Sequence, residues 1–134
     1  MRFALLLLAA LLCLGRPAFA DDVAAAQTVI RSQEQAFIRD DASAAYSYAA
    51  PAIRELFPEA GIFMHMVQRA YGPVYRHKSF EFGEARAEHG QIAQRVHIID
   101  ADGRPWDALY TLERQADGSF KIIGCVLLKA GESV

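Results

Sequence analysis

The sequence lacks several features that would point to a particular class of protein. It contains no asparagine, and therefore no N-glycosylation site. It has two cysteines and neither a C-x-x-C nor an H-E-x-x-H motif. It also has no internal repeat, no low-complexity linker and no recognisable catalytic signature. The 134 residues are enough for one domain with its own core, and nothing in them indicates a second.

The first twenty residues have the pattern of an export signal. Arg2 precedes an unbroken apolar run from Phe3 to Leu14, and Ala18-Phe19-Ala20 forms a small-x-small cleavage site. The run is shorter than the ~20 apolar residues that a membrane-spanning helix needs. We therefore expect residues 1–20 to be removed after Ala20 and residues 21–134 to form a single α+β domain. The protein should be periplasmic or secreted, with no membrane anchor.

The chain beyond Ala20 is acidic and keeps one cysteine. Without Arg2 and Arg16, twelve Lys and Arg face sixteen Asp and Glu, a net charge of about −4. Such a chain has no excess positive charge for a phosphate backbone, so nucleic acid is not an expected partner. Cys125 alone cannot form an internal disulfide, and stability must come from a hydrophobic core.

The first half of this chain has helical periodicity. Four apolar residues of the first helix lie on one face: Val23, Ala26, Ile30 and Phe37. Asp40-Asp41 provides N-caps for a short second helix, and Gly72-Pro73 ends a third. We expect three helices in all. The second helix, the turn after it and the third helix are predicted over Ala42–Ala50, Pro51–Phe57 and from Pro58 to Tyr71.

Beyond Pro73 the periodicity changes to two, which is typical of strands. Asp102-Gly103 and Asp117-Gly118 are hairpin signals that divide the last part of the chain. The pattern predicts an antiparallel meander of four strands with the helices packed on one face, an α+β fold. The strands are expected at Val74–Arg86, His89–Asp100, Trp106–Gln115 and Phe120–Lys129.

The last strand is apolar on both faces. By simple alternation, Ile122, Gly124, Val126 and Leu128 share one face, while Ile123, Cys125 and Leu127 share the other. Because the helices can cover only one face, we expect a homodimer packed through the sheet. The alternative is that the C-terminal tail or a long side chain shields this strand. Cys125 is expected to be a small buried core residue.

Several segments together resemble a known family. They are Ala70–Arg76, Phe80–Glu84, Trp106–Glu113 and Ile122–Cys125, with Asp40-Asp41 and Ala49–Ile53. The family is an exported bacterial one of uncharacterised function, the domain-of-unknown-function family 4864. The resemblance implies the cone-shaped, cystatin-like α+β fold of the nuclear transport factor 2-like superfamily. In that fold, the three N-terminal helices pack on a curved four-stranded antiparallel sheet. The superfamily includes ketosteroid isomerase and many binding modules, so the fold alone does not indicate a function. Because the family itself is uncharacterised, the resemblance implies no activity.

An enzyme of the ketosteroid-isomerase kind would need a carboxylate base and an oxyanion donor in an apolar pocket. Strand parity places Gln94 and Tyr110 on the inner face of the sheet, without a central Asp, Glu or His. The base would have to come from a helix, as Glu34 or Asp40. The simpler interpretation makes Gln33 and Glu34 rim residues and gives the core tyrosines satisfied hydroxyls. A cofactor-free isomerase or hydrolyase is therefore the alternative.

Metal binding is not expected. Met64-His65-Met66 contains soft ligands, but adjacent helical positions do not converge on one point. We expect neither a metal nor a cofactor.

The sequence favours a non-enzymatic binding or accessory module whose apolar interior holds a small apolar ligand. The aromatic residues expected to line that interior are Phe37, Tyr46, Phe63, Tyr71, Trp106 and Tyr110. A third hypothesis is a structural or interaction protein that acts through an apolar sheet surface around Cys125 and Leu127.

Overall fold

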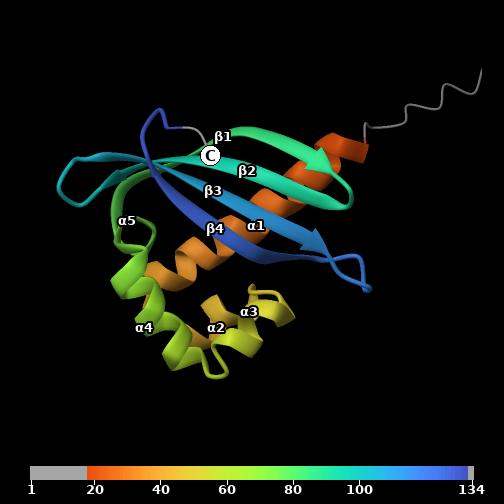
Figure 1. The fold of residues 1–134 in the computed structure, drawn as a ribbon, viewed down its shortest axis with the longest axis horizontal. Helices are drawn as coiled ribbons and strands as arrows, with labels where there is room; N and C mark the ends of the chain where they lie inside the picture. The colour runs from red at the N-terminus through yellow and green to blue at the C-terminus, as the bar shows by residue number, and fades with distance from the viewer. Residues whose placement is uncertain (1–17, 133–134) are drawn as a thin grey trace, which may run out of the picture.

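A long helix and a four-stranded sheet dominate the fold (Figure 1). The computed structural model describes residues 18–132. In chain order the helices are α1 (Ala18–Ile38), α2 (Ala42–Ser47), α3 (Pro51–Leu56), α4 (Ala60–Ala70) and α5 (Gly72–Tyr75). The strands are β1 (His77–Glu88), β2 (Gln91–Asp100), β3 (Pro105–Arg114) and β4 (Phe120–Lys129). The strands are all antiparallel in the order β1-β2-β3-β4, so the α+β class and the meander are confirmed.

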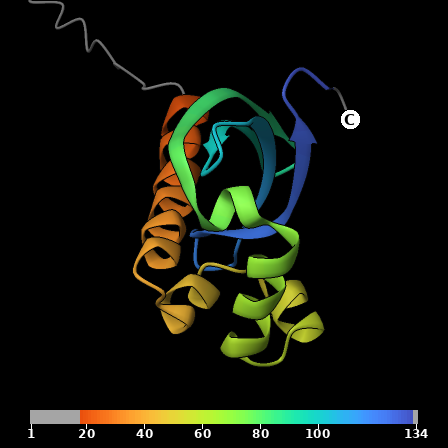
Figure 2. The same ribbon diagram turned by 90° about the vertical axis from the view of Figure 1, so that its left-hand side faces the viewer.

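The sheet is strongly curved, and α1 runs along its concave side while α2, α3 and α4 gather at one end (Figure 2). The buried face of α1 includes Ala26, Ile30 and Phe37, three of the four residues of the predicted stripe. Residues 1–17 of the predicted signal lie outside the described residues. Because α1 begins at Ala18, the predicted cleavage point after Ala20 falls within its first turn. No helix in residues 18–132 is both long and apolar enough to cross a membrane.

The described residues contain five helices where three were predicted. The second helix ends at Ser47 because the segment after it pairs with β4: the Ile122 amide donates to the Tyr48 carbonyl, and the Ala50 amide donates to the Ile122 carbonyl. Pro51 then begins α3. Gly72-Pro73 does separate two helices, but it also starts the short helix α5. The N-cap prediction is confirmed for Asp41, whose carboxylate accepts the Ala44 amide at 3.0 Å.

An extra residue in β4 changes the direction of the side chains that follow it. Ile122 lies opposite Leu112, whereas Gly124 lies opposite Thr111, so Ile123 has no partner of its own on β3. This is a β-bulge, which inserts one residue into one strand of a pair.

The bulge overturns the predicted faces of β4. Cys125 lies opposite the buried Tyr110, and Leu127 opposite the buried Ala108, so both point to the concave side together with Ile122. Val126 is exposed on the other side. The apolar outer surface predicted around Cys125 and Leu127 therefore does not exist, because these two residues face the helices.

A second bulge, in β1, allows a close approach to β2. The register shifts between Phe82 and Ala85, and a Cβ on Gly83 would lie 2.6 Å from His97 Nε2. Only glycine fits beside His97 in its present position. The carbonyls of Gly83 and Arg95 both accept from the buried Gln94 amide, at 3.0 and 2.8 Å, and Gln94 Oε1 accepts from Gln27 of α1 at 3.0 Å. Gln94 thus ties the helix to the sheet without leaving a buried polar atom unpaired.

Asp107 holds together a polar cluster on the convex side of the sheet. Its carboxylate accepts from His97 Nδ1 at 2.7 Å and from Arg95 at 3.1 Å. Burial alone would raise the pKa of Asp107. The hydrogen bonds from His97 and the Gly131 amide, with the nearby charges of His97 and Arg95, outweigh it, so the pKa is lowered.

Asp107→Asn is expected to lower the free energy of unfolding at pH 7 by about 1–3 kcal/mol. A carboxyl with a lowered pKa stabilises the folded state above its ordinary pKa of ~4 and loses that effect as the pH falls. The difference between wild type and variant should therefore shrink between pH 7 and pH 3 in urea unfolding curves. Asp102→Asn, exposed in the β2–β3 turn, is the control. A difference that stays constant with pH would contradict the role given to the Asp107 charge.

Candidate functional site: an apolar pocket

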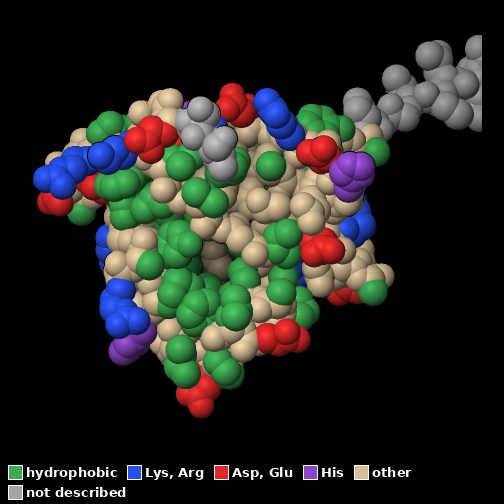
Figure 3. Space-filling model, viewed as in Figure 1, with side chains coloured by type: hydrophobic (Ala, Val, Ile, Leu, Met, Phe, Trp, Pro, Cys, Tyr) green, Lys and Arg blue, Asp and Glu red, His purple; other side chains and the backbone are tan. Residues whose placement is uncertain are grey.

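A pocket of about 230 Å³ lies between the sheet and the helices at one end of the molecule. In the view of Figure 3, hydrophobic side chains surround a hollow near the centre of the surface. The fifteen lining residues are Gln33, Phe37, Ala49, Ile53, Phe57, Phe63, Met66, Val67, Tyr71, Val74, Tyr110, Ile122, Ile123, Gly124 and Cys125. None of these fifteen carries a charge at neutral pH.

Separate parts of the chain build the pocket walls. α1 contributes Gln33 and Phe37 from its C-terminal half, and α4 contributes its apolar stripe with Phe63, Met66 and Val67. The sheet contributes Tyr110 and the residues around the β4 bulge. The bulge matters here because it turns the Cys125 side chain toward the pocket. The same pairing of Ile122 with Tyr48 and Ala50 holds β4 against the segment that leads into α3.

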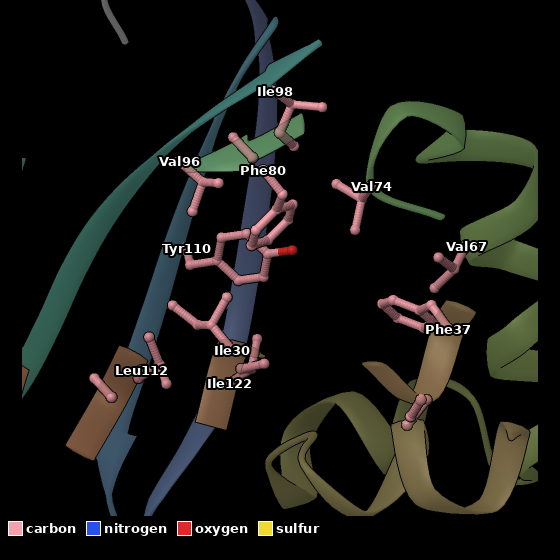
Figure 4. Close-up of a cluster of buried hydrophobic side chains, with 14 of the residues drawn as sticks. Ile30, Phe37, Val67, Val74, Phe80, Val96, Ile98, Tyr110, Leu112 and Ile122 are labelled. Atoms are coloured by element: carbon pink, nitrogen blue, oxygen red, sulfur yellow. The ribbon is translucent and has the colours of Figure 1, made fainter. Parts of the chain in front are cut away.

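Tyr110 supplies the most deeply placed polar group of the pocket. Its side chain is 2% exposed, yet its hydroxyl makes no hydrogen bond within residues 18–132. Since every fully enclosed side-chain nitrogen or oxygen described has a partner, this hydroxyl borders open space in the pocket. Figure 4 shows its oxygen pointing from the sheet toward Phe37, Val67 and Val74. Burial, together with nearby Cys125, Glu34 and Tyr71, raises the pKa of Tyr110 well above its ordinary value, so the hydroxyl keeps its proton.

Gln33 is the second polar group that lines the pocket. Its side chain is buried, and its Nε2 donates to the Ala45 carbonyl at 3.1 Å. Its Oε1 accepts no hydrogen bond from another described residue and so also borders the pocket space. Gln33 was expected at the rim of the helix and is instead buried, because α2 covers this side of α1.

The other titratable side chains of the pocket wall, Cys125 and Tyr71, are neutral. Burial raises the pKa of the Cys125 thiol to about 12, so the thiol is neutral and a poor nucleophile. The Tyr71 hydroxyl donates to the Cys125 carbonyl at 2.9 Å, and burial raises the Tyr71 pKa as well. Cys125, expected to be a small buried core residue, is partly buried, packs against the core and forms part of the pocket wall.

The structure brings four of the six predicted site residues to the pocket: Phe37, Phe63, Tyr71 and Tyr110. Tyr46 lies behind Phe63, with ring centroids 5.6 Å apart, and its hydroxyl donates to the Phe57 carbonyl at 2.6 Å. Trp106 lies elsewhere, at the start of β3, where its Nε1 donates to Asp100 at 2.9 Å. Neither Tyr46 nor Trp106 lines the pocket.

The sequence did not single out several aliphatic lining residues as part of a site. Met66 and Val67 belong to the predicted apolar stripe of α4, so helical periodicity had marked them as buried but not as bordering a void. Ile123 reaches the pocket because of the β4 bulge, for which the sequence carries no local signal.

The two carboxylates considered as catalytic bases are both engaged elsewhere. Glu34 is buried and lies 2.7 Å from His77 Nε2 and 2.6 Å from an Arg31 nitrogen. Asp40, on the surface, accepts from the Tyr75 hydroxyl and from Arg76; these contacts lower its pKa. Neither lines the pocket. Within residues 18–132, no group of three His, Cys, Asp or Glu side chains is placed to hold a metal ion.

The fold and this site define a small α+β protein with an open, uncharged, largely apolar pocket. The chain belongs to the family described as Domain of unknown function (DUF4864), whose model matches residues 20–133. No curated protein and no solved structure shows significant similarity to it.

Proposed function

We propose that this protein is a non-enzymatic binding module that holds a small apolar ligand in the pocket between the sheet and α4. The observation that carries the proposal is the pocket wall: fifteen residues from both halves of the chain, almost all apolar, around about 230 Å³. Concave apolar sites with a few polar groups are the usual form of small-molecule sites. The volume is below the range of ~300–1,000 Å³ typical for drug-sized ligands, so the ligand is smaller than these.

The same wall argues against catalysis. General acid–base chemistry needs a titratable group within hydrogen-bond reach of the substrate. The titratable side chains that line the pocket are Tyr71, Tyr110 and Cys125, and burial raises the pKa of all three. Each stays protonated at neutral pH and cannot act as a base. The pocket thus favours binding over proton transfer.

We further propose the cone-shaped fold of the nuclear transport factor 2-like superfamily and export by residues 1–20. A long first helix across a strongly curved meander, with a pocket at the end closed by short helices, supports the first of these. The charge, apolar run and small-x-small motif of the N-terminus support the second.

A homodimer packed through the sheet is also a proposal. The exposed Val126 on the convex side of the sheet supports it.

Filling the pocket tests the binding proposal. Val67→Phe adds an aromatic ring at a lining position and is expected to lower the occupancy of any co-purifying small molecule about tenfold or more, because the ring takes up ligand space. Ile62→Phe introduces the same ring at an exposed position of α4 that does not line the pocket, and it should leave occupancy unchanged. Native mass spectrometry of gently purified protein measures bound mass and oligomeric state together. Equal occupancy in both variants would exclude this pocket as the site.

A further inference from the structure

We propose that the ligand of this pocket is an uncharged molecule that carries a hydroxyl group, an alcohol or a phenol, on a small apolar skeleton. This inference rests on the proposed binding function and specifies the chemical class of the ligand. It comes from the two polar groups that border the pocket space and from the absence of charge in its wall.

The absence of charged side chains from the pocket wall disfavours a charged ligand. None of the fifteen lining residues is Lys, Arg, His, Asp or Glu. A carboxylate or ammonium group would lose its hydration in the pocket without gaining an opposite charge, and an unpaired ion is far more costly to bury than a neutral polar group. Fatty acids and amines are thus disfavoured relative to neutral compounds of the same size.

Tyr110 requires a polar atom in the ligand. Its hydroxyl is deep in the pocket, points toward the space between the sheet and α4, and has no partner in the described chain (Figure 4). A purely hydrocarbon ligand would displace water from this hydroxyl and leave it unpaired, which costs more than the missing hydrogen bond itself contributes. Because the raised pKa keeps its proton in place, Tyr110 can donate to an oxygen of the ligand.

Gln33 distinguishes a hydroxyl from a carbonyl. One Nε2 hydrogen of Gln33 is donated to the Ala45 carbonyl, and its Oε1, an amide oxygen without a partner among the described residues, can only accept. A ketone or ester oxygen can accept from Tyr110 but has no hydrogen for Gln33. A hydroxyl can accept from a donor such as Tyr110 and donate to an acceptor such as Gln33, so it is the simplest group that matches both.

Four probes with one aromatic skeleton test the inference: 2-naphthol, 2-methoxynaphthalene, 2-methylnaphthalene and 2-naphthoate. Binding to the purified full chain is measured by isothermal titration calorimetry or by ligand fluorescence. We expect 2-naphthol to bind at least about fivefold more tightly than 2-methylnaphthalene, the effect of one or more net hydrogen bonds. We expect 2-methoxynaphthalene, which cannot donate, to fall between them, and 2-naphthoate to bind about tenfold or more weakly than 2-naphthol.

Tyr110→Phe removes the hydroxyl and keeps the ring. It should reduce the preference for 2-naphthol, because only the Gln33 acceptor remains, while leaving the affinity for 2-methylnaphthalene unchanged or slightly higher. Tyr48→Phe is the matched control, since Tyr48 does not line the pocket. The inference is overturned if 2-methylnaphthalene or 2-naphthoate binds the wild type as tightly as 2-naphthol, or if Tyr110→Phe retains the full preference of the wild type. If no probe binds and purified protein carries no bound mass, the binding function itself fails, which separates the two outcomes.

Discussion

Replacement of Glu34 by alanine is expected to lower the free energy of unfolding by about 3 kcal/mol, because removal of a buried carboxylate leaves its hydrogen-bond partners unpaired. The Glu34 and His77 side chains are only 4% and 6% exposed. Both ring nitrogens of His77 lie beside acceptors: Nε2 is 2.7 Å from Glu34, and Nδ1 is 3.1 Å from the Pro73 carbonyl. Without Glu34, His77 Nε2 and the Arg31 guanidinium both lose the carboxylate that they contact.

A double variant separates the loss of the pair from the loss of packing. Glu34→Leu combined with His77→Phe replaces both buried partners by apolar groups of similar size. Such exchanges are often neutral or stabilising, so the double variant should lie within about 1 kcal/mol of wild type or above it. Arg31, which is partly exposed, can then turn to solvent. Urea unfolding measures all three proteins; a Glu34→Ala variant as stable as wild type would show that the pair contributes nothing.

Phe37→Ala should destabilise the protein by a similar amount, about 3–5 kcal/mol. The ring is 1% exposed and packs against Phe63 and Tyr75, with centroids 6.4 and 6.1 Å apart. It joins α1 to α4 and α5 and also lines the pocket, so truncation removes buried surface and enlarges a void that is already present.

The next residue of α1 is the control for Phe37. Ile38 is 50% exposed, and Ile38→Ala should change the free energy of unfolding by no more than about 0.5 kcal/mol. The comparison is made by urea unfolding at pH 7, with equal slopes required before the midpoints are compared. If the two variants were equally stable, the core around Phe37 would not be packed as the structure describes.

The class of the fold followed from periodicity, because burial on one side imposes a period of 3.6 on helices and of 2 on strands. The stripe of α1 and the Asp-Gly turns between strands carry that information locally. The end of α2 does not: Ser47 is its last residue because Tyr48 and Ala50 bond to Ile122, about seventy residues later in the chain. A long-range hydrogen bond leaves no mark in the local pattern.

The sequence predicts only part of the candidate site, because long-range pairing leaves no local sequence pattern here either. The sequence predicts Phe37, Phe63 and Tyr110 at the site because large aromatic residues on inward faces usually meet in the interior. Trp106 shares the face of Tyr110 on β3, but it stands at the end of the strand, and its indole bonds to Asp100 instead. The β4 bulge reversed the faces of Cys125 and Leu127 relative to Ile122, and simple alternation cannot reveal an inserted residue.

The pairing of the Tyr48–Ala50 segment with Ile122 also bears on the accessibility of the β4 edge. β4 is the last strand of the sheet, and an unpaired edge strand is a template for adding another chain. Here the chain's own backbone occupies the edge at Ile122, and the Tyr71 hydroxyl occupies the Cys125 carbonyl three residues further along. A foreign strand could not align with the first half of β4 without displacing both. The helical half of the chain thus covers the first half of this edge of the sheet as well as forming one wall of the pocket.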